Sequence, residues 1–221
     1  MTPLTLGVFG AFQVTLTNGS IARFESDKAR ALLAYLAVES DRPHRRDALI
    51  GLLWPNESEP TARQNFRQAL YNLRQTIRDS SARPPYLLIT RDEIQFNPAS
   101  KFTLDLASFN AHLAATASHS HSRLDACAIC APRLQQAIDL YRGKFLQEFF
   151  LSDSAEFEEW AVAQRESLHQ HALDALTDLG SYYEQNGDLV AARRCAMRAL
   201  ELDPWREQAH RQMMRVFALE G

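Results

Sequence analysis

Four arginines between residues 61 and 78 recur at a spacing that suits one helix surface and the binding of phosphate groups. At about 100° per residue they fall within an arc of about 60°. They are Arg63, Arg67, Arg74 and Arg78. Amide and phenol side chains fill the outward face beside them, at Gln64, Gln68, Tyr71, Asn72 and Gln75. Arginine neutralises phosphates, and glutamine or asparagine hydrogen-bonds base edges in the major groove, so the segment predicts a helix that binds duplex DNA.

An ordinary solvated helix face is the alternative interpretation of this segment. Such faces usually mix acids with bases, because opposite charges four residues apart support a helix. Residues 61–78 contain no acid, and like charges at positions 63 and 67 repel one another. We therefore favour a polyanion as the partner of this face, and we expect its guanidinium groups not to be paired with carboxylates from elsewhere in the chain.

Three further arginines are candidate DNA contacts outside this segment. Arg91 lies at the charged tip of a predicted hairpin, from which it could enter an adjacent minor groove. A plain surface role is the alternative for Arg91. Arg45 and Arg46 precede or open a predicted helix whose N-terminal amides favour phosphate oxygens, so we expect them to contact the DNA backbone rather than the bases.

The elements that must position these residues follow from hydrophobic period and from proline. Apolar and β-branched runs at 4–8 and 12–16 predict a small N-terminal sheet. Helical spacing predicts a first helix from Ser26 to before Pro43, a second over 46–53 that ends before Pro55, and a third from after Pro60 to about Ile77. Runs at 86–90 and 94–96 predict a hairpin. The expected fold class of this half is therefore α+β.

After Pro98 the chain is predicted to be helical throughout, apart from a small, polar stretch at 114–122. We expect a DNA-binding domain over residues 1–100, a junction over 101–122 and an all-α domain over 123–221.

One 34-residue tetratricopeptide pattern can be placed in the second half. With Pro204 at position 32 of the pattern, its marked positions are occupied by Leu179, Gly180, Tyr183, Ala192 and Ala199. Gly187 and Asp188 supply the predicted turn between the two helices of this repeat. The next unit opens at Glu207 and reaches its turn at Gly221. A half repeat at the end is either a capping helix or the end of a truncated chain, and we favour a truncated piece of a longer protein.

Charge and targeting features narrow the function class without fixing it. Residues 1–100 carry 12 Lys and Arg against 10 Asp and Glu, whereas the rest carry 12 against 17, which divides the net charge of −3 into +2 and −5. No apolar run is long enough for a membrane helix, and the first residues lack the order of a secretory signal, so we expect a cytoplasmic protein.

His119, His121, Cys127 and Cys130 offer the donor atoms of a tetrahedral zinc site. The spacing between the two halves is shorter than in the usual finger, and both cysteines are predicted on one helix face, where burial as small apolar thiols is common. We therefore expect no metal. The phosphate loop, zinc-protease, serine-hydrolase and dinucleotide motifs are absent from the sequence, so we expect neither a cofactor nor a catalytic step.

Three stretches in the first half, taken in order, resemble the bacterial antibiotic regulatory protein family of activators. These are residues 28–37 (KARALLAYLA), 52–55 (LLWP) and 65–74 (NFRQALYNLR). Residues 140–146, 157–160 and 165–168 resemble the bacterial transcriptional activator domain that follows in this family. The resemblance implies an OmpR-type winged helix whose third helix reads the major groove of promoter DNA at direct repeats, with the hairpin as wing. It also implies a tetratricopeptide-like domain that serves dimerisation and contacts with RNA polymerase or another protein.

The resulting hypothesis is a sequence-specific transcriptional activator. Two alternatives stay open: a protein-interaction scaffold whose winged helix does not bind DNA, and a metal-dependent enzyme, which would contain zinc when purified.

Overall fold

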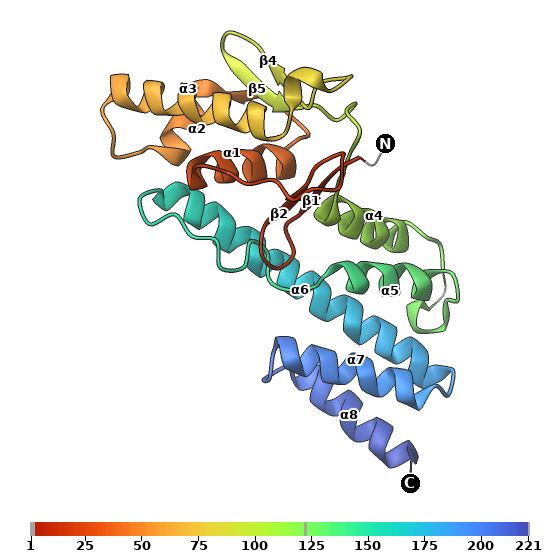
Figure 1. Cartoon of the computed structure of the whole chain (residues 1–221). Helices are drawn as coiled ribbons and strands as arrows, with labels where there is room; N and C mark the ends of the chain where they lie inside the picture. Colours follow the sequence, from red (N-terminus) through yellow and green to blue (C-terminus); the bar gives the residue numbers. More distant parts are fainter. Residues whose placement is uncertain (1–2, 122, 221) are drawn as a thin grey trace. The chain divides into compact units, whose positions relative to one another are not determined.

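The computed structural model describes residues 3–121 and 123–220, so the predicted boundary at Ser122 and the predicted turn at Gly221 lie outside the described residues. The chain forms two compact units, and Figure 1 follows their elements along the sequence. The N-terminal unit combines the described residues up to Leu106 with residues 145–164. The C-terminal unit combines the described residues of 107–144 with those from Arg165 onward.

Three strands form the first sheet of the N-terminal unit, in the order β2-β1-β6. Strand β1 (Leu4–Gly7) pairs antiparallel with β2 (Gln13–Thr15) and parallel with β6 (Phe102–Leu104). The prediction of helix throughout after Pro98 is wrong at β6. A run of three residues is too short to show a strand period, and pairing with the distant β1 makes it a strand.

Three helices contact one another in the same unit, namely α1 (Asp27–Val38), α2 (Arg46–Leu53) and α3 (Glu59–Thr76). Large apolar side chains from all three are buried between them, including Leu32, Leu53, Phe66 and Leu73. Pro60 lies in the first turn of α3, where a missing amide costs nothing. The three predicted helices are confirmed, with the predicted bounds for α2 and with bounds that differ by one to a few residues for α1 and α3.

The predicted hairpin consists of β4 (Leu87–Ile89) and β5 (Glu93–Phe96), which pair antiparallel. A strand that the sequence did not predict, β3 (His44–Arg45), pairs with the other edge of β5. Between α3 and this sheet lies a 3₁₀ turn, η1 (Asp79–Ser81). The start of α2 is thereby joined to the hairpin, because Arg46 follows β3 directly.

The C-terminal unit is helical. Its elements are α4 (Asp105–Ala117), the 3₁₀ turn η2 (Leu124–Ala126), α5 (Cys130–Leu140), α6 (Ala155–Gln185), α7 (Leu189–Leu202) and α8 (Glu207–Glu220), of which α4 and α6 begin within the N-terminal unit. Leu134, Leu173, Leu176 and Leu179 are among the residues of its buried core.

The turn between α6 and α7 has the predicted chemistry. Gly187 has a φ of 75°, and the Asp188 carboxylate accepts a hydrogen bond from the Ala191 amide at 2.9 Å. Helix α8 begins at Glu207, as the repeat period predicts. Within the described residues, no helix is both long enough and apolar enough to span a membrane.

The prediction that Cys127 and Cys130 share one helix is wrong. Cys127 follows η2, and Cys130 is the first residue of α5. The 3₁₀ turn interrupts the helical path because the Cys127 amide bonds back to the Leu124 carbonyl oxygen.

Candidate nucleic-acid interface

Helix α3 buries one face and leaves the opposite face open to solvent. Ala62, Phe66, Ala69, Leu70 and Leu73 are buried against the rest of the N-terminal unit. The outward side chains are exposed, apart from the half-buried Asn72, and they are Arg63, Gln64, Arg67, Gln68, Tyr71, Arg74 and Gln75. Arg78 is also exposed, but α3 ends at Thr76 and Arg78 has a left-handed φ, so it does not continue the helical row that the sequence predicts. The division between the two faces is the one that the helical period predicts, so one helix presents basic, amide and phenol groups together.

Two of the four arginines have no ionic partner. The guanidinium groups of Arg67 and Arg78 make no hydrogen bond or ion pair with any described part of the chain. Arg78 follows α3 with a φ of 56°, in the left-handed region, so the backbone turns away from the helix axis at this residue. Both positive charges are therefore available to an external anion.

The expectation that none of the four guanidinium groups is paired with a carboxylate is wrong at Arg63. Its guanidinium group contacts Glu59 at 2.9 Å, one turn earlier on α3, and Asp47 of α2 at 3.2 Å. Both acids lie outside the acid-free segment 61–78, and Asp47 comes from another helix, so the spacing within α3 does not reveal them. All three side chains are more than half exposed, and exposed ion pairs of this kind are worth about 1 kcal/mol or less, so the Arg63 pair can open for a phosphate.

The expectation is also wrong at Arg74, and there the ion pair is structural. Arg74 Nε donates to Asp79 Oδ2 at 3.0 Å, and the other carboxylate oxygen of Asp79 accepts the Leu87 amide at 3.0 Å. Asp79 is only 2% exposed. A buried carboxylate therefore joins the end of α3 to the first strand of the hairpin, while part of the Arg74 side chain still reaches solvent.

The amides of the outward face are ordered by one another. Gln68 Nε2 donates to Asn72 Oδ1 at 2.9 Å, one turn further along α3. This bond leaves the Gln68 carbonyl oxygen and the Asn72 amino group open to other partners. Tyr71, at 59% exposure, lies beside them with its phenol ring in solvent.

The three arginines in and beside the hairpin have different environments. Arg91 is exposed in the turn between β4 and β5, and its side chain has no partner within the described residues. Arg46 instead binds inward, because its guanidinium group donates to the Thr90 carbonyl oxygen at 2.9 Å and its Nε is buried. The Arg45 side chain on β3 is exposed and has no partner in the described chain, whereas the Arg45 backbone pairs with β5. Arg46 thus holds the base of the hairpin turn, whereas Arg45 and Arg91 are open to solvent.

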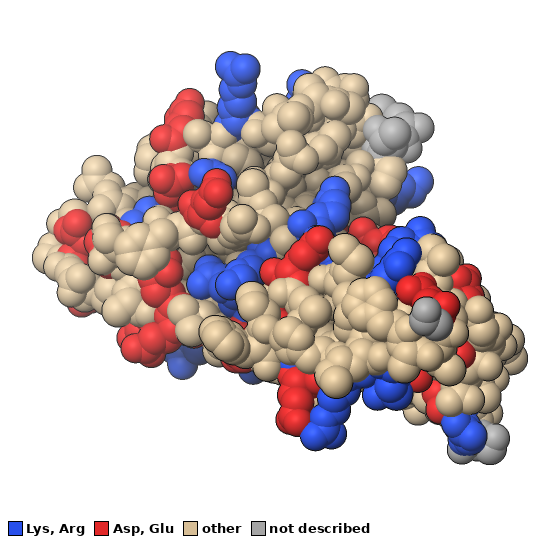
Figure 2. Space-filling model, turned by 90° about the horizontal axis from the view of Figure 1, so that it is seen from below, with Lys and Arg blue, Asp and Glu red and all other residues tan. Residues whose placement is uncertain are grey.

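The face drawn in Figure 2 carries charges of both signs. Basic and acidic atoms lie next to one another on this face, without a region of one sign. The acid-free row at residues 61–78 differs from this face, and it does not follow from the net charge of −3.

Two comparisons with known proteins bear on this arrangement. The family model described as "Bacterial transcriptional activator domain" matches residues 104–221, which is more than half of the chain. A solved structure of Mycobacterium tuberculosis EmbR, in complex with a low affinity phosphopeptide, matches all of this chain with a TM-score of 0.76 and 24% sequence identity. This chain spans 56% of the length of that EmbR chain, and the likeness concerns the fold. No curated protein sequence matches the chain.

Proposed function

Because the chain belongs to the bacterial transcriptional activator domain family, we propose that it is a transcriptional activator that binds promoter DNA in a sequence-specific manner through α3. The match to this family confirms the predicted activator domain in the second half of the chain. The observation that carries the DNA-binding part of the proposal is the outward face of α3, where unpaired guanidinium groups lie beside exposed amides. It supplies charge for the phosphates and hydrogen-bonding groups for base edges on one helix surface.

In this proposal the first 100 residues form a winged helix. Helix α3 is the recognition helix, and the β4–β5 hairpin is the wing. The Asp79 carboxylate supports this interpretation, because it ties the end of α3 to β4 and thus fixes the hairpin relative to the helix. Residues 101–122 form the proposed junction, which contains β6 of the first sheet and α4, and residues 123–221 form the proposed tetratricopeptide-like domain. The family match itself begins within this junction, at residue 104.

The side chains take distinct roles in the proposed complex. Arg67, Arg78, Arg45 and Arg91 bind phosphates or, for Arg91, the minor groove, because they are exposed and unpaired within the described chain. Gln64, Gln68, Tyr71 and Asn72 face the base edges. Arg63 joins them after exchanging a carboxylate for a phosphate, whereas Arg74 keeps its bond to Asp79 and reaches a phosphate with the exposed part of its guanidinium group. Arg46 acts indirectly by holding the hairpin turn.

Protein contacts are assigned to the C-terminal unit. Stacked helix pairs offer an extended surface to partners. We propose that this unit contacts RNA polymerase or another protein and supports a homodimer, so that two copies occupy a direct repeat. No catalytic step is part of this function.

The proposal is tested with duplexes selected from a random-sequence pool by the full chain. Arg67→Ala should weaken binding to the selected and to a random duplex by the same factor, because phosphates carry no sequence. Gln68→Ala should weaken binding to the selected duplex by about 5- to 150-fold while changing the random duplex little, since a lost base contact is worth about 1–3 kcal/mol. Arg211→Ala is the matched control, because Arg211 is an exposed helical arginine on α8.

Two outcomes would contradict the proposal. One is a selection that enriches no sequence. The other is equal affinity of the parent, Arg67→Ala and Gln68→Ala proteins for every duplex, which is what a scaffold without DNA affinity predicts.

A further inference from the structure

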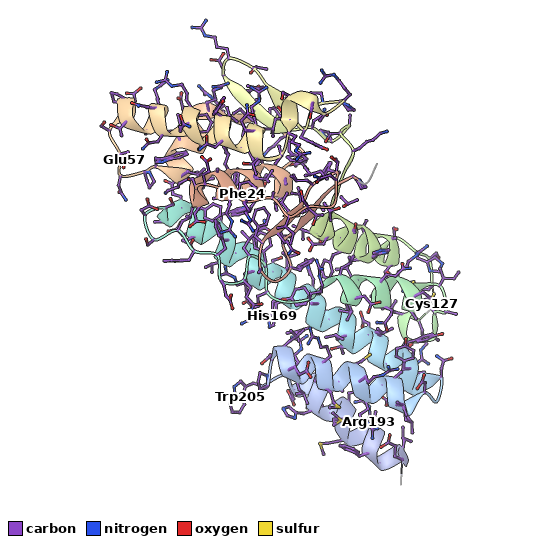
Figure 3. All side chains as sticks on the ribbon, in the orientation of Figure 1. Phe24, Glu57, Cys127, His169, Arg193 and Trp205 are labelled. Carbon is purple, nitrogen blue, oxygen red and sulfur yellow. The ribbon has the colours of Figure 1, made fainter. Side chains whose placement is uncertain are left out.

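Four side chains with metal-binding donor atoms meet in the C-terminal unit. They are His119, His121, Cys127 and Cys130, and their donor atoms all lie within 4.8 Å of one another. The residues come from the connection between α4 and α5, where Cys127 is labelled in Figure 3, and from the first turn of α5. A short stretch of chain thus brings two imidazoles and two thiols to one point.

Three sulfur–nitrogen separations match the edges of a tetrahedron around a single ion. Zinc–sulfur bonds of about 2.3 Å and zinc–nitrogen bonds of about 2.0–2.1 Å place a sulfur and a nitrogen ligand about 3.6 Å apart. In the structure, His119 Nδ1 lies 3.6 Å from Cys127 Sγ and 3.4 Å from Cys130 Sγ. His121 Nδ1 lies 3.8 Å from Cys130 Sγ. Both histidines therefore present the same ring nitrogen at the separation that coordination requires.

The bound cation itself would favour thiolates over thiols at this point, because a thiol that coordinates a metal loses its proton. Cys130 is buried at the first position of α5, and the Cys127 carbonyl oxygen accepts the amides of Cys130 and Ala131, which fixes the backbone between the two sulfur ligands. Two thiolates also balance the charge of a divalent cation, so the filled site is neutral and suits its partly buried position.

We propose that these four residues bind one Zn²⁺ ion through the two Sγ atoms and the two Nδ1 atoms. Binding releases the thiol protons to solvent and leaves each Nε2 carrying the imidazole proton. All four tetrahedral positions are taken by the protein, as in structural rather than catalytic zinc sites. The ion holds together the connection between α4 and α5, where the described residues of 118–129 contain no regular element except the turn η2.

The expectation of no metal follows from the prediction of both cysteines on one helix and from the spacing of the usual zinc finger. In such a finger about 12 residues separate the two ligand pairs. Here only residues 122–126 separate His121 from Cys127. Because η2 turns the chain back within that interval, the two pairs meet without the long intervening segment of a finger. The inference does not depend on DNA binding.

The metal content of the untagged full chain tests the proposal directly. After purification without chelator and gel filtration, we expect about one zinc ion per chain by elemental analysis. The double variant Cys127→Ser/Cys130→Ser should lose the zinc, as should His119→Ala/His121→Ala. The matched controls Cys195→Ser and His171→Ala should keep it, since Cys195 is a buried thiol on α7 and His171 an exposed imidazole on α6.

Cobalt substitution gives a second readout that does not depend on how the variants fold. Adding Co²⁺ to the chelator-treated parent chain should produce visible bands of a tetrahedral site and a thiolate charge-transfer band that saturates at about one equivalent. Added Zn²⁺ should abolish these bands and raise the unfolding temperature.

Three results would overturn the proposal. The first is a purified chain without zinc whose spectrum and unfolding temperature do not respond to Co²⁺ or Zn²⁺. The second is zinc retained in the double cysteine variant. The third is a Cys127–Cys130 disulfide, detected by mass spectrometry under denaturing conditions, in protein purified with a reductant.

Discussion

Gly180 on α6 lies where a side chain from α8 comes closest to the helix backbone. A Cβ atom built on Gly180 would be 2.5 Å from Gln212 Oε1 and 2.8 Å from Gln212 Cδ. Gln212 is 2% exposed, and its Nε2 is buried without a hydrogen-bond partner in the described chain. Gly180→Ala must therefore displace a buried amide by about 1 Å to restore ordinary contacts of about 3.5 Å.

Two opposing contributions set the expected size of this effect. Overpacking a buried contact costs about 1–3 kcal/mol, and replacing glycine by alanine inside a helix gains up to about 1 kcal/mol. The expected net result is a loss of about 1 kcal/mol in the free energy of unfolding. Gly51→Ala is the matched control on α2, because no atom lies within 4 Å of its built Cβ, and it should stabilise the chain by about 0.5–1 kcal/mol.

Urea unfolding followed by circular dichroism measures these differences. The cause is isolated by a double-mutant cycle, because truncating the amide in Gln212→Ala removes the clash. In that background Gly180→Ala should become neutral or stabilising. If Gly180→Ala costs the same free energy in both backgrounds, or stabilises the parent as Gly51→Ala does, the close approach of α6 and α8 is not the reason for glycine at this position.

Three further predictions follow from individual side chains. Asp47→Asn should raise affinity for any duplex by up to about fivefold in a binding titration, because Arg63 then loses its ion pair with Asp47 and keeps only the one with Glu59. Unchanged or weaker binding would contradict this. Asp79→Ala should lower the free energy of unfolding by about 2 kcal/mol in urea, since the Leu87 amide loses its partner, whereas Asp79→Asn, which keeps an acceptor, should cost less. Burial raises the pKa of the Cys195 thiol to about 11, so at pH 8 its alkylation should be about 100-fold slower than in the urea-unfolded chain, and equal rates by mass spectrometry would refute its burial.

The elements around the candidate interface could be predicted because their signals are local. Helix α3 shows a clear apolar period, and Pro60 marks its start. The strand β6 and the bridges that join Phe9 to Phe145 and Ala11 to Gln147 could not be predicted, because they form between segments 98 to 136 residues apart in the sequence. Their residues show no period of their own, so only the folded chain identifies the partners.

Some features of the candidate site could likewise be predicted from the sequence, and others could not. The exposure of Arg67, Gln68 and Tyr71 follows from the helical period alone. The ion pairs of Arg63 and Arg74 do not, because one acid comes from α2 and the other from the turn after α3. The residue types alone indicated donor atoms for zinc. That the four donor atoms lie close together depends on the turn η2, and the sequence pattern predicts helix at that place.

The dependence of DNA affinity on salt tests the central claim most directly, because it counts the phosphates that the protein neutralises. The exposed guanidinium groups of Arg45, Arg67 and Arg78, which are unpaired within the described chain, predict a slope of log affinity against log salt of about −2.7, at about −0.9 per phosphate. The slope becomes about −3.6 when Arg91 binds a phosphate rather than the minor groove. Phosphate contacts from Arg63, released from its carboxylates, and from the exposed part of Arg74 would steepen it to about −5.4. We expect the full chain to show a slope in this range on a duplex of random sequence between about 50 and 200 mM salt. Weak binding with a slope near zero would contradict the assignment of α3 as a DNA-binding helix.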